Sequence, residues 1–244
     1  MNRMLFGDSR DLFKFDLVRH IMKAFPDLAS FTLVPMLTEE EPVTGKKKTA
    51  TQDLAMAQKN GRAGTQNREL MEDMGRLREI NDDIEYFHGV QSYFKKENII
   101  VDVLYKDTFS HEHRMNYFNE VLFGNFPKNS LIFLDPDTGL EVKNPTQRHL
   151  LFDEVKKIYD CMDPQSVLMI YQHLPGVTRA GYIDKRCREL TAVTHSRPET
   201  ITDNEIVFFI LTKNPQIKTR LCAVLGRYAD KYNSLITFDC GEKP

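Results

Sequence analysis

Cysteine is scarce and unpatterned in this sequence, since Cys161, Cys187, Cys222 and Cys240 form no CxxC pair. Structural zinc sites and disulfide frameworks are recognised by such regular spacings. We therefore expect four free thiols and no metal site. No apolar run reaches the roughly 18 residues that a membrane-spanning helix needs, and the opening stretch MNRMLFGDSRDLFKF lacks the long apolar centre of a secretory signal. The sequence predicts a cytoplasmic protein with no membrane partner.

A strong excess of either charge is also missing, because 33 Lys and Arg stand against 35 Asp and Glu, for a net charge of -2. This balance argues against an electrostatic grip on nucleic acid by the whole chain, although a local basic face stays open. The composition, 41% hydrophobic and 28% charged, is that of a globular protein. We expect a single α/β domain spanning residues 1–244, without internal repeats.

Helical and strand patterns alternate along most of the chain. Apolar residues at helical spacing predict helices, and short runs rich in branched and aromatic residues predict strands. The helices are expected at 11–25, 113–126, 147–162, 183–193 and 215–232, and the strands at 30–37, 98–109, 130–137, 166–174, 205–213 and 234–240. Such alternation is typical of crossover units. It predicts a Rossmann-like three-layer αβα sandwich with a largely parallel sheet.

Residues 38–95 break the alternation and are expected to form a polar and helical insertion or lid. The first part, to about residue 66, is polar and punctuated by glycines, as in a long loop with one short helix. The second part, 67–94, carries apolar residues near helical spacing and is expected to be a helix. The insertion is locally basic at Lys46 to Lys48, Lys59, Arg62 and Arg68, which suits either a phosphate backbone or a solvated loop.

An acidic, glycine-hinged loop follows the strand expected at 130–137, where SLIFL runs into Asp135-Pro-Asp137-Thr-Gly. In an open α/β sheet, ligands collect beyond the carboxyl ends of the strands. Asp135 and Asp137 are therefore candidate catalytic residues. The same letters are also ordinary turn chemistry. A third interpretation adds Glu141 and Lys143 in a metal-dependent nuclease, although their spacing is too tight to place these groups on neighbouring strands.

Two further clusters are expected at the same edge of the sheet. The strand expected at 166–174 delivers Tyr171, Gln172 and His173, which suit contacts to a base as well as a capped turn. Ahead of the first helix, the stretch GDSRDLFKF places Asp11 near the helix start and Lys14 about one turn further on. Taken alone, this third cluster is a capped helix with a salt bridge.

Together the clusters resemble those of class I S-adenosylmethionine-dependent methyltransferases that act on the adenine N6 of large-subunit ribosomal RNA. That family carries G-N-x-A-D-V-x-K-H at its entry helix, which Gly7, Asp11 and Lys14 match here. It carries Asp-Pro-Pro-Tyr after a later strand, of which this chain keeps the first two letters, Asp135 and Pro136. The whole pattern looks like that of a divergent bacterial group related to these enzymes.

The resemblance implies a class I methyltransferase-like fold, S-adenosylmethionine as cofactor and a nucleic-acid base as acceptor. It implies a catalytic role for Asp135, with Tyr171 or Phe13 flanking the base, and cofactor-binding roles for Asp11 and Lys14. Asp137 and His173 are further catalytic candidates because of their places at the strand ends, and Thr38 and Glu39, after the first core strand, are candidate cofactor contacts. Two features depart from the family. The stacking aromatic of its motif is absent, and the first core strand runs into VPMLTEEEPVTG, which has no glycine before Gly45. A glycine-rich turn normally lets the backbone approach the cofactor there.

Three functions therefore stand at the level of sequence. The leading one is a methyltransferase acting on a nucleic-acid base or similar planar nitrogen. The second is a non-catalytic descendant of that fold that binds a nucleotide, nucleic acid or a protein. The third is a metal-dependent hydrolase using Asp135, Asp137 and Glu141.

Overall fold

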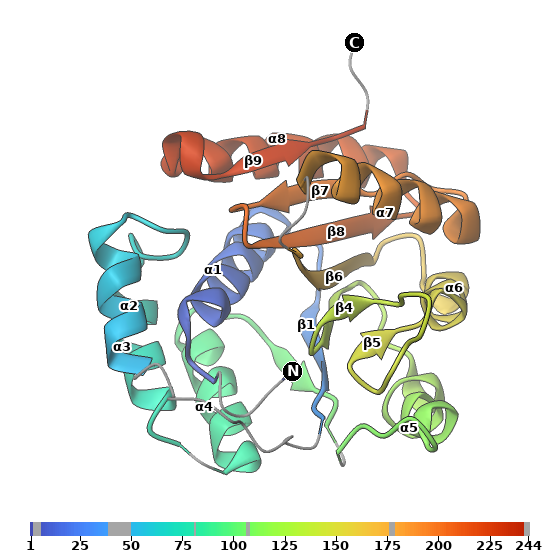
Figure 1. The fold of residues 1–244 in the computed structure, drawn as a ribbon, viewed down its shortest axis with the longest axis horizontal. Coiled ribbons are helices and arrows are strands. Elements are labelled where there is room, and N and C mark those ends of the chain that lie inside the picture. Colours follow the sequence, from blue (N-terminus) through green and yellow to red (C-terminus); the bar gives the residue numbers. More distant parts are fainter. Residues whose placement is uncertain (2–5, 39–49, 81, 106–107, 176–178, 242–244) are drawn as a thin grey trace.

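A seven-stranded sheet forms the centre of the protein (Figure 1), whose computed structural model describes residues 1, 6–38, 50–80, 82–105, 108–175 and 179–241. The strand order is β2-β1-β3-β6-β8-β7-β9. Strands β8 and β9 run opposite to the other five. The strands of this sheet are β1 (Ser30–Met36), β2 (Val101–Val103), β3 (Ser130–Pro136), β6 (Val167–His173), β7 (Glu199–Thr202), β8 (Ile206–Thr212) and β9 (Thr237–Asp239).

Helices cover both faces of the sheet. The helices are α1 (Ser9–Ala24), α2 (Ala50–Lys59), α3 (Arg68–Leu77), α4 (Asp83–Lys96), α5 (Arg114–Val121), α6 (Phe152–Cys161), α7 (Arg179–Thr194) and α8 (Pro215–Lys231), with short 3-10 turns η2 (Phe123–Asn125) and η3 (Asn233–Leu235). A small parallel pair, β4 (Gly139–Leu140) and β5 (His149–Leu150), follows β3. None of the helices in the described part of the chain is long and apolar enough to cross a membrane.

The core is divided by the sheet into two apolar clusters, because side chains alternate between the faces of a strand. In β3, Leu131 and Phe133 pack with residues of α1, α3, α4 and α8. Ile132 and Leu134 pack on the other face with residues of α5, α6 and α7. Burial on both faces explains why the central strands read as continuous apolar runs. The predicted Rossmann-like three-layer α/β fold is confirmed.

The first helix begins two residues earlier than the pattern predicts. Asp8 is its N-cap, and its side chain accepts hydrogen bonds from the backbone N–H groups of Arg10 and Asp11 at 2.8 and 3.1 Å. Asp11 is therefore not the N-cap of the helix, although its place near the helix start suggested that role. It lies in the first turn with its side chain buried.

The segment expected to be an insertion is helical and tightly packed where it is described. The single helix expected over 67–94 is two helices, α3 and α4, and a further helix, α2, precedes them. Asn67 caps α3 and also donates a 3.0 Å hydrogen bond to Asp16 of α1. Leu70 and Tyr86 are fully buried in the same cluster as α1. The described part of this segment therefore belongs to the helical layer over the sheet, while residues 39–49 lie outside the described part.

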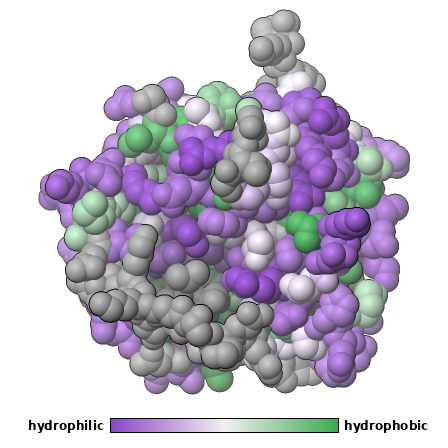
Figure 2. All heavy atoms as spheres, viewed as in Figure 1, coloured by the Kyte–Doolittle hydropathy of each residue, from purple (hydrophilic) through white to green (hydrophobic). Residues whose placement is uncertain are grey.

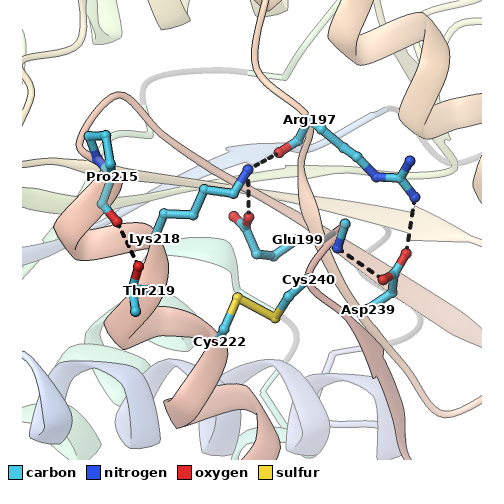
Figure 3. The surroundings of a disulfide bond; sticks show 9 residues. Arg197, Glu199, Pro215, Lys218, Thr219, Cys222, Asp239 and Cys240 are labelled. Carbon is cyan, nitrogen blue, oxygen red and sulfur yellow. Dashed lines mark hydrogen bonds and ion pairs between the residues drawn. A yellow bond between two sulfur atoms is a disulfide. The ribbon is translucent and has the colours of Figure 1, made fainter. Parts of the chain in front are cut away.

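The expectation of four free thiols is wrong, because Cys222 and Cys240 form a disulfide (Figure 3). The spacing of the cysteines in the sequence does not indicate this bond. Helix α8 and strand β9 lie side by side (Figure 1), which brings two cysteines 18 residues apart within a Cα–Cα distance of 5.8 Å. Cys161 is exposed and Cys187 is buried, and both are free.

Candidate functional site at the carboxyl edge of the sheet

Two of the predicted clusters leave the sheet side by side. Strands β3 and β6 are parallel neighbours whose register pairs Leu134 with Ile170. The next residues, Asp135 in β3 and Tyr171 in β6, therefore lie next to each other at the carboxyl edge of the sheet. The first turns of α1 lie against this edge, and Lys14 reaches both residues. The structure thus brings together four residues singled out in three separate stretches of sequence, namely Asp11, Lys14, Asp135 and Tyr171.

Lys14 is held between two buried carboxylates. Its Nζ donates to Oδ1 of Asp11 at 3.0 Å and to Oδ2 of Asp135 at 2.9 Å. The same Nζ lies 4.4 Å from the centroid of the Tyr171 ring, in a cation–π contact. Exposure is 5% for Lys14, 2% for Asp11 and 1% for Asp135. This cluster, Asp11–Lys14–Asp135, is called the charge triad below.

The electrostatics of the triad follow from burial and pairing. Burial lowers the pKa of the Lys14 ammonium, but Asp135 and Asp11 more than offset this effect and hold it above its ordinary value. Burial raises the pKa of Asp135 and outweighs the opposing effects of Lys14. Oδ1 of Asp135 has no hydrogen-bond partner among the described residues, although it is buried. A buried acceptor without a donor costs free energy, so this oxygen is suited to accept a hydrogen bond from a ligand.

A cavity of about 20 Å³ lies over the triad, large enough for about one water molecule. Met1 and Phe6 are among the residues that line it. The amino group of Met1 donates to the carbonyl oxygens of Met36 at 2.8 Å and of Asp135 at 3.2 Å. The ends of β1 and β3 therefore already accommodate an ammonium or amine. The polar side chains that line the cavity are Asp8, Arg10, Asp11, Lys14, Asp135, Asp137 and Tyr171.

Asp137 and His173 lie at the rim of this edge. Asp137 lines the cavity and is paired with Arg148, whose Nε lies 2.5 Å from its Oδ2. His173 is partly buried at the end of β6, and its Nδ1 has no hydrogen-bond partner in the described part of the chain. Burial, followed by the charge of Arg10, lowers the pKa of His173. Its imidazole is therefore neutral at pH 7 and available as an acceptor.

Two further predicted residues, Thr38 and Phe13, do not line the cavity. Thr38 is buried just past β1, and its N–H donates to the carbonyl of Met1 at 3.2 Å. Glu39 lies outside the described residues. Phe13 is buried in the core between Phe208 and Tyr228.

Gln172, which seemed suited to read a base edge, is engaged by the protein itself. It accepts from the N–H of Leu140 at 2.8 Å and donates to the carbonyls of Thr138 and His173. Gly139 lies directly against it with a φ of +132°, and a Cβ there would lie 2.4 Å from the Gln172 side chain. The glycine of the acidic loop is required by this close approach.

Tyr86 of α4 is the main site residue that the sequence did not reveal. Its hydroxyl donates to Oδ2 of Asp11 at 2.7 Å, and the N–H of Gly7 donates to the same oxygen at 2.9 Å. Gly7 has a φ of +69°, and a Cβ there would lie 2.8 Å from the carbonyl oxygen of Met74. Arg10, which also lines the cavity, lies inside the recognised motif, but Tyr86 is 75 residues from Asp11 and carried no local signal.

The carboxylates proposed for metal binding do not converge. Glu141 accepts a hydrogen bond from the N–H of Phe152 at 2.6 Å and does not line the cavity with Asp135 and Asp137. Within the described ranges, no three His, Cys, Asp or Glu side chains are grouped so as to hold a metal ion. Lys14 occupies the position between carboxylates that a cation would need.

The basic part of the insertion is only partly available to a partner. Arg62 is paired with Asp203 at 2.8 Å and Glu205 at 2.9 Å. Lys46 to Lys48 lie outside the described residues. On the face shown in Figure 2 the surface is mostly hydrophilic, and hydrophobic side chains are scattered rather than gathered.

Comparison with known proteins adds no assignment, because no protein-family model matches the sequence and no match was found among curated proteins. The site must therefore be interpreted from its own chemistry.

Proposed function

We propose that this protein is an S-adenosylmethionine-dependent methyltransferase that acts on a planar nitrogen such as the exocyclic amine of a nucleic-acid base. The observation that carries the proposal is the state of Asp135. Its Oδ2 is fixed by Lys14, while its Oδ1 is buried beside a cavity without a partner in the described residues. This arrangement suits an acceptor for the N–H of an attacking amine, at the sheet edge where α/β proteins bind ligands.

The cofactor's amino-acid end fits groups that the structure provides. S-adenosylmethionine carries an α-amino group, and the carbonyls of Met36 and Asp135 already accept hydrogen bonds from the amino group of Met1, whose pKa burial lowers to about 5. The ligand's ammonium would take the place of the Met1 amino group, since the remaining cavity holds only about one water molecule. When bound, the cofactor supplies the methyl group. Thr38 and Glu39, which follow β1, are the proposed neighbours of its amino-acid end.

The protein's own contribution to the reaction is mainly positioning. Asp135 would accept a hydrogen bond from the acceptor nitrogen and thereby turn its lone pair toward the methyl donor. Lys14 keeps that carboxylate in one orientation, and Asp11 keeps Lys14 in place. Holding donor and acceptor in line accounts for much of the rate in such transfers. Tyr171 is 3% exposed and carries Lys14 over its ring, so it would shape the pocket beneath the triad.

Two classes of methyl acceptor should be tested in turn. Adenine-containing RNA comes first because of the resemblance, and single-stranded DNA comes second. Enzymes that act on a base take it out of the stack, so unpaired nucleotides are the appropriate substrates. His173 and Arg10 at the rim are the proposed contacts to the flipped nucleotide.

A non-catalytic binding protein of the same fold is the second candidate, and the small size of the cavity favours it. Thermal shift assays separate the two, because a ligand that binds only the folded state raises the melting temperature. Stabilisation by S-adenosylhomocysteine supports the methyltransferase. If S-adenosylhomocysteine, S-adenosylmethionine and Mg²⁺ all leave the melting temperature unchanged, the result supports the binding protein. If Mg²⁺ alone raises it, the result supports a hydrolase.

Activity is tested with Asp135→Asn and a matched control. Burial of the ionised Asp135 is already costly, so the amide should leave the melting temperature nearly unchanged while abolishing methyl transfer to RNA. Asp16→Asn is the control, because Asp16 is buried on α1 and hydrogen-bonded to Tyr228 and Tyr232 but lies outside the cavity. It should lose stability and keep turnover per folded molecule. Full activity in Asp135→Asn would remove Asp135 from the mechanism.

A further inference from the structure

A continuous chain of polar contacts runs from α4 through α1 to the end of β3. The Tyr86 hydroxyl donates to Oδ2 of Asp11 at 2.7 Å. Oδ1 of the same carboxylate accepts from Lys14 at 3.0 Å, and Lys14 donates on to Asp135 at 2.9 Å. All four side chains are buried. The segment between β1 and β2, expected to be an insertion, thus contributes a side chain directly to the site.

The phenol of Tyr86 is fixed in place and remains a donor. Its ring stacks on Phe6 with centroids 3.8 Å apart and an interplanar angle of 11°, and it meets Phe87 edge-on at 5.4 Å. Burial, together with the charge of Asp11, raises the pKa of Tyr86 well above its ordinary value. The hydroxyl therefore keeps its proton throughout the accessible pH range and always has one to donate.

We infer that Tyr86 is a positioning residue that sets how Lys14 is shared between Asp11 and Asp135. Its hydrogen bond draws negative charge on Asp11 toward Oδ2, away from Lys14. Lys14 is then left to neutralise Asp135, the carboxylate that the proposed function places against the acceptor nitrogen. The inference rests on that proposed function for its catalytic meaning, but the charge balance itself is a property of the protein alone.

Loss of the Tyr86 hydroxyl should change the pKa of Asp135 in one direction. Without the phenol, Oδ2 of Asp11 keeps, among the described residues, only the N–H of Gly7 as a donor, and the carboxylate attracts Lys14 more strongly. Asp135 then loses part of the positive charge that offsets its burial, so its carboxylate becomes harder to ionise and its pKa rises. The groups that face Asp135 or line the same cavity and enter this balance come from every element around it. They are Asp8, Arg10, Asp11 and Lys14 at the start of α1, the Met1 amino group, Tyr86 of α4, Tyr171 of β6 and Asp137 of the following loop.

The test is an NMR titration of the Asp135 side-chain carboxyl carbon in the full chain, assigned with Asp135→Asn. Tyr86→Phe keeps the ring and its stacking and removes only the hydroxyl. The expected result is a rise of about one unit in the pKa of Asp135, which is a tenfold change in its ionisation constant. Tyr93→Phe is the matched control, because Tyr93 is buried on the same helix and its hydroxyl contacts Asn67, outside the triad. It should leave the Asp135 titration unchanged.

A second replacement covers the case in which Tyr86→Phe does not fold. Substituting 3-fluorotyrosine at position 86 preserves the side chain and strengthens the phenol as a donor, so the pKa of Asp135 should fall. An unchanged Asp135 titration in the variant that folds, or a shift opposite to the one stated, would overturn the inference.

The test of Tyr86 is independent of the test of the proposed function, because the Asp135 titration needs no cofactor or substrate. If S-adenosylhomocysteine does not bind the wild type, the methyltransferase proposal fails and the Tyr86 titration still gives its answer. If methyl transfer is found, Tyr86→Phe should lower kcat several-fold with little change in KM for the nucleic acid, and shift the acidic limb of the pH–rate profile upward. Tyr93→Phe should do neither.

Discussion

Replacing Lys14 by Met is the sharpest perturbation of the charge triad. Methionine keeps an unbranched side chain of similar length and removes the ammonium, so the packing of α1 against the ends of β3 and β6 is largely retained. Asp11 and Asp135 are then left as buried carboxylates without their shared cation. The variant isolates the electrostatic role of Lys14 from its volume.

The magnitude follows from the burial of the three groups. Removing one partner of a buried ion pair costs about 3–5 kcal/mol, since the remaining charge is uncompensated. All three members of the triad are at least 95% buried, so the Lys14→Met loss should fall in that range at pH 8. For a chain of this size, the melting temperature should fall by about 6–20 °C.

The loss should depend on pH in a direction that the structure fixes. Without Lys14, the folded-state pKa of Asp135, already above its ordinary 3.8, rises further. An acid whose folded pKa is raised loses stability as pH climbs from its unfolded pKa toward its folded pKa. The Lys14→Met deficit should therefore be smaller at pH 5 than at pH 8. Lys14 itself adds no slope there, because its raised pKa lies above an ordinary value of 10.5.

Urea denaturation at pH 5 and pH 8 measures the loss in the free energy of unfolding and its dependence on pH. The double variant Lys14→Met with Asp135→Asn should recover about 1–3 kcal/mol of the loss at pH 8, because the two residues are in contact. Lys23→Met is the matched control on the same helix, since Lys23 is 45% exposed in its ion pair with Glu97, and such pairs are worth about 1 kcal/mol or less. A Lys14→Met loss below that of the control at both pH values would refute the account of the triad.

Three further predictions concern single features of the structure. Burial and Asp11 raise the pKa of Asp8 to about 7, so Asp8→Asn, which keeps a capping acceptor, should stabilise the protein at pH 8 and less at pH 5 in urea titrations. Gly139→Ala should cost about 1–3 kcal/mol by calorimetry, whereas Gly181→Ala in open space on α7 should be neutral or stabilising. Replacing Cys222 and Cys240 together by Ser should cost about 3 kcal/mol, a difference that vanishes under reducing conditions.

Much of the fold could be predicted because the central elements carry strong local patterns. The continuous apolar run ending at Asp135 indicated a strand buried on both faces, and β3 is one. The differences concern elements whose existence or extent depends on neighbours. Strand β7, with only four residues, was not predicted, and the strand expected at 98–109 is reduced in the described residues to Val101–Val103, an edge strand with one partner. The strand predicted at 234–240 is present as the shorter edge strand β9, next to the disulfide.

The candidate site was predictable only to the extent that topology implies proximity. Parallel neighbouring strands place Asp135 and Tyr171 at one edge, and a preceding helix brings Asp11 and Lys14 to it. The contact of Tyr86 with Asp11 depends instead on which face of α4 packs inward, and no spacing in the sequence specifies this. Likewise, Gln172 looked like a free polar side chain, because its partners are backbone groups of a loop more than thirty residues away.

The most direct test of the central claim is an NMR titration of the backbone amides with S-adenosylhomocysteine. The account predicts saturable shifts confined to the ends of β1, β3 and β6 and to the first turn of α1, with the largest near Met36, Asp135 and Tyr171. Absence of shifts at these residues up to about 1 mM ligand, the upper end of ordinary enzyme affinities, would contradict it.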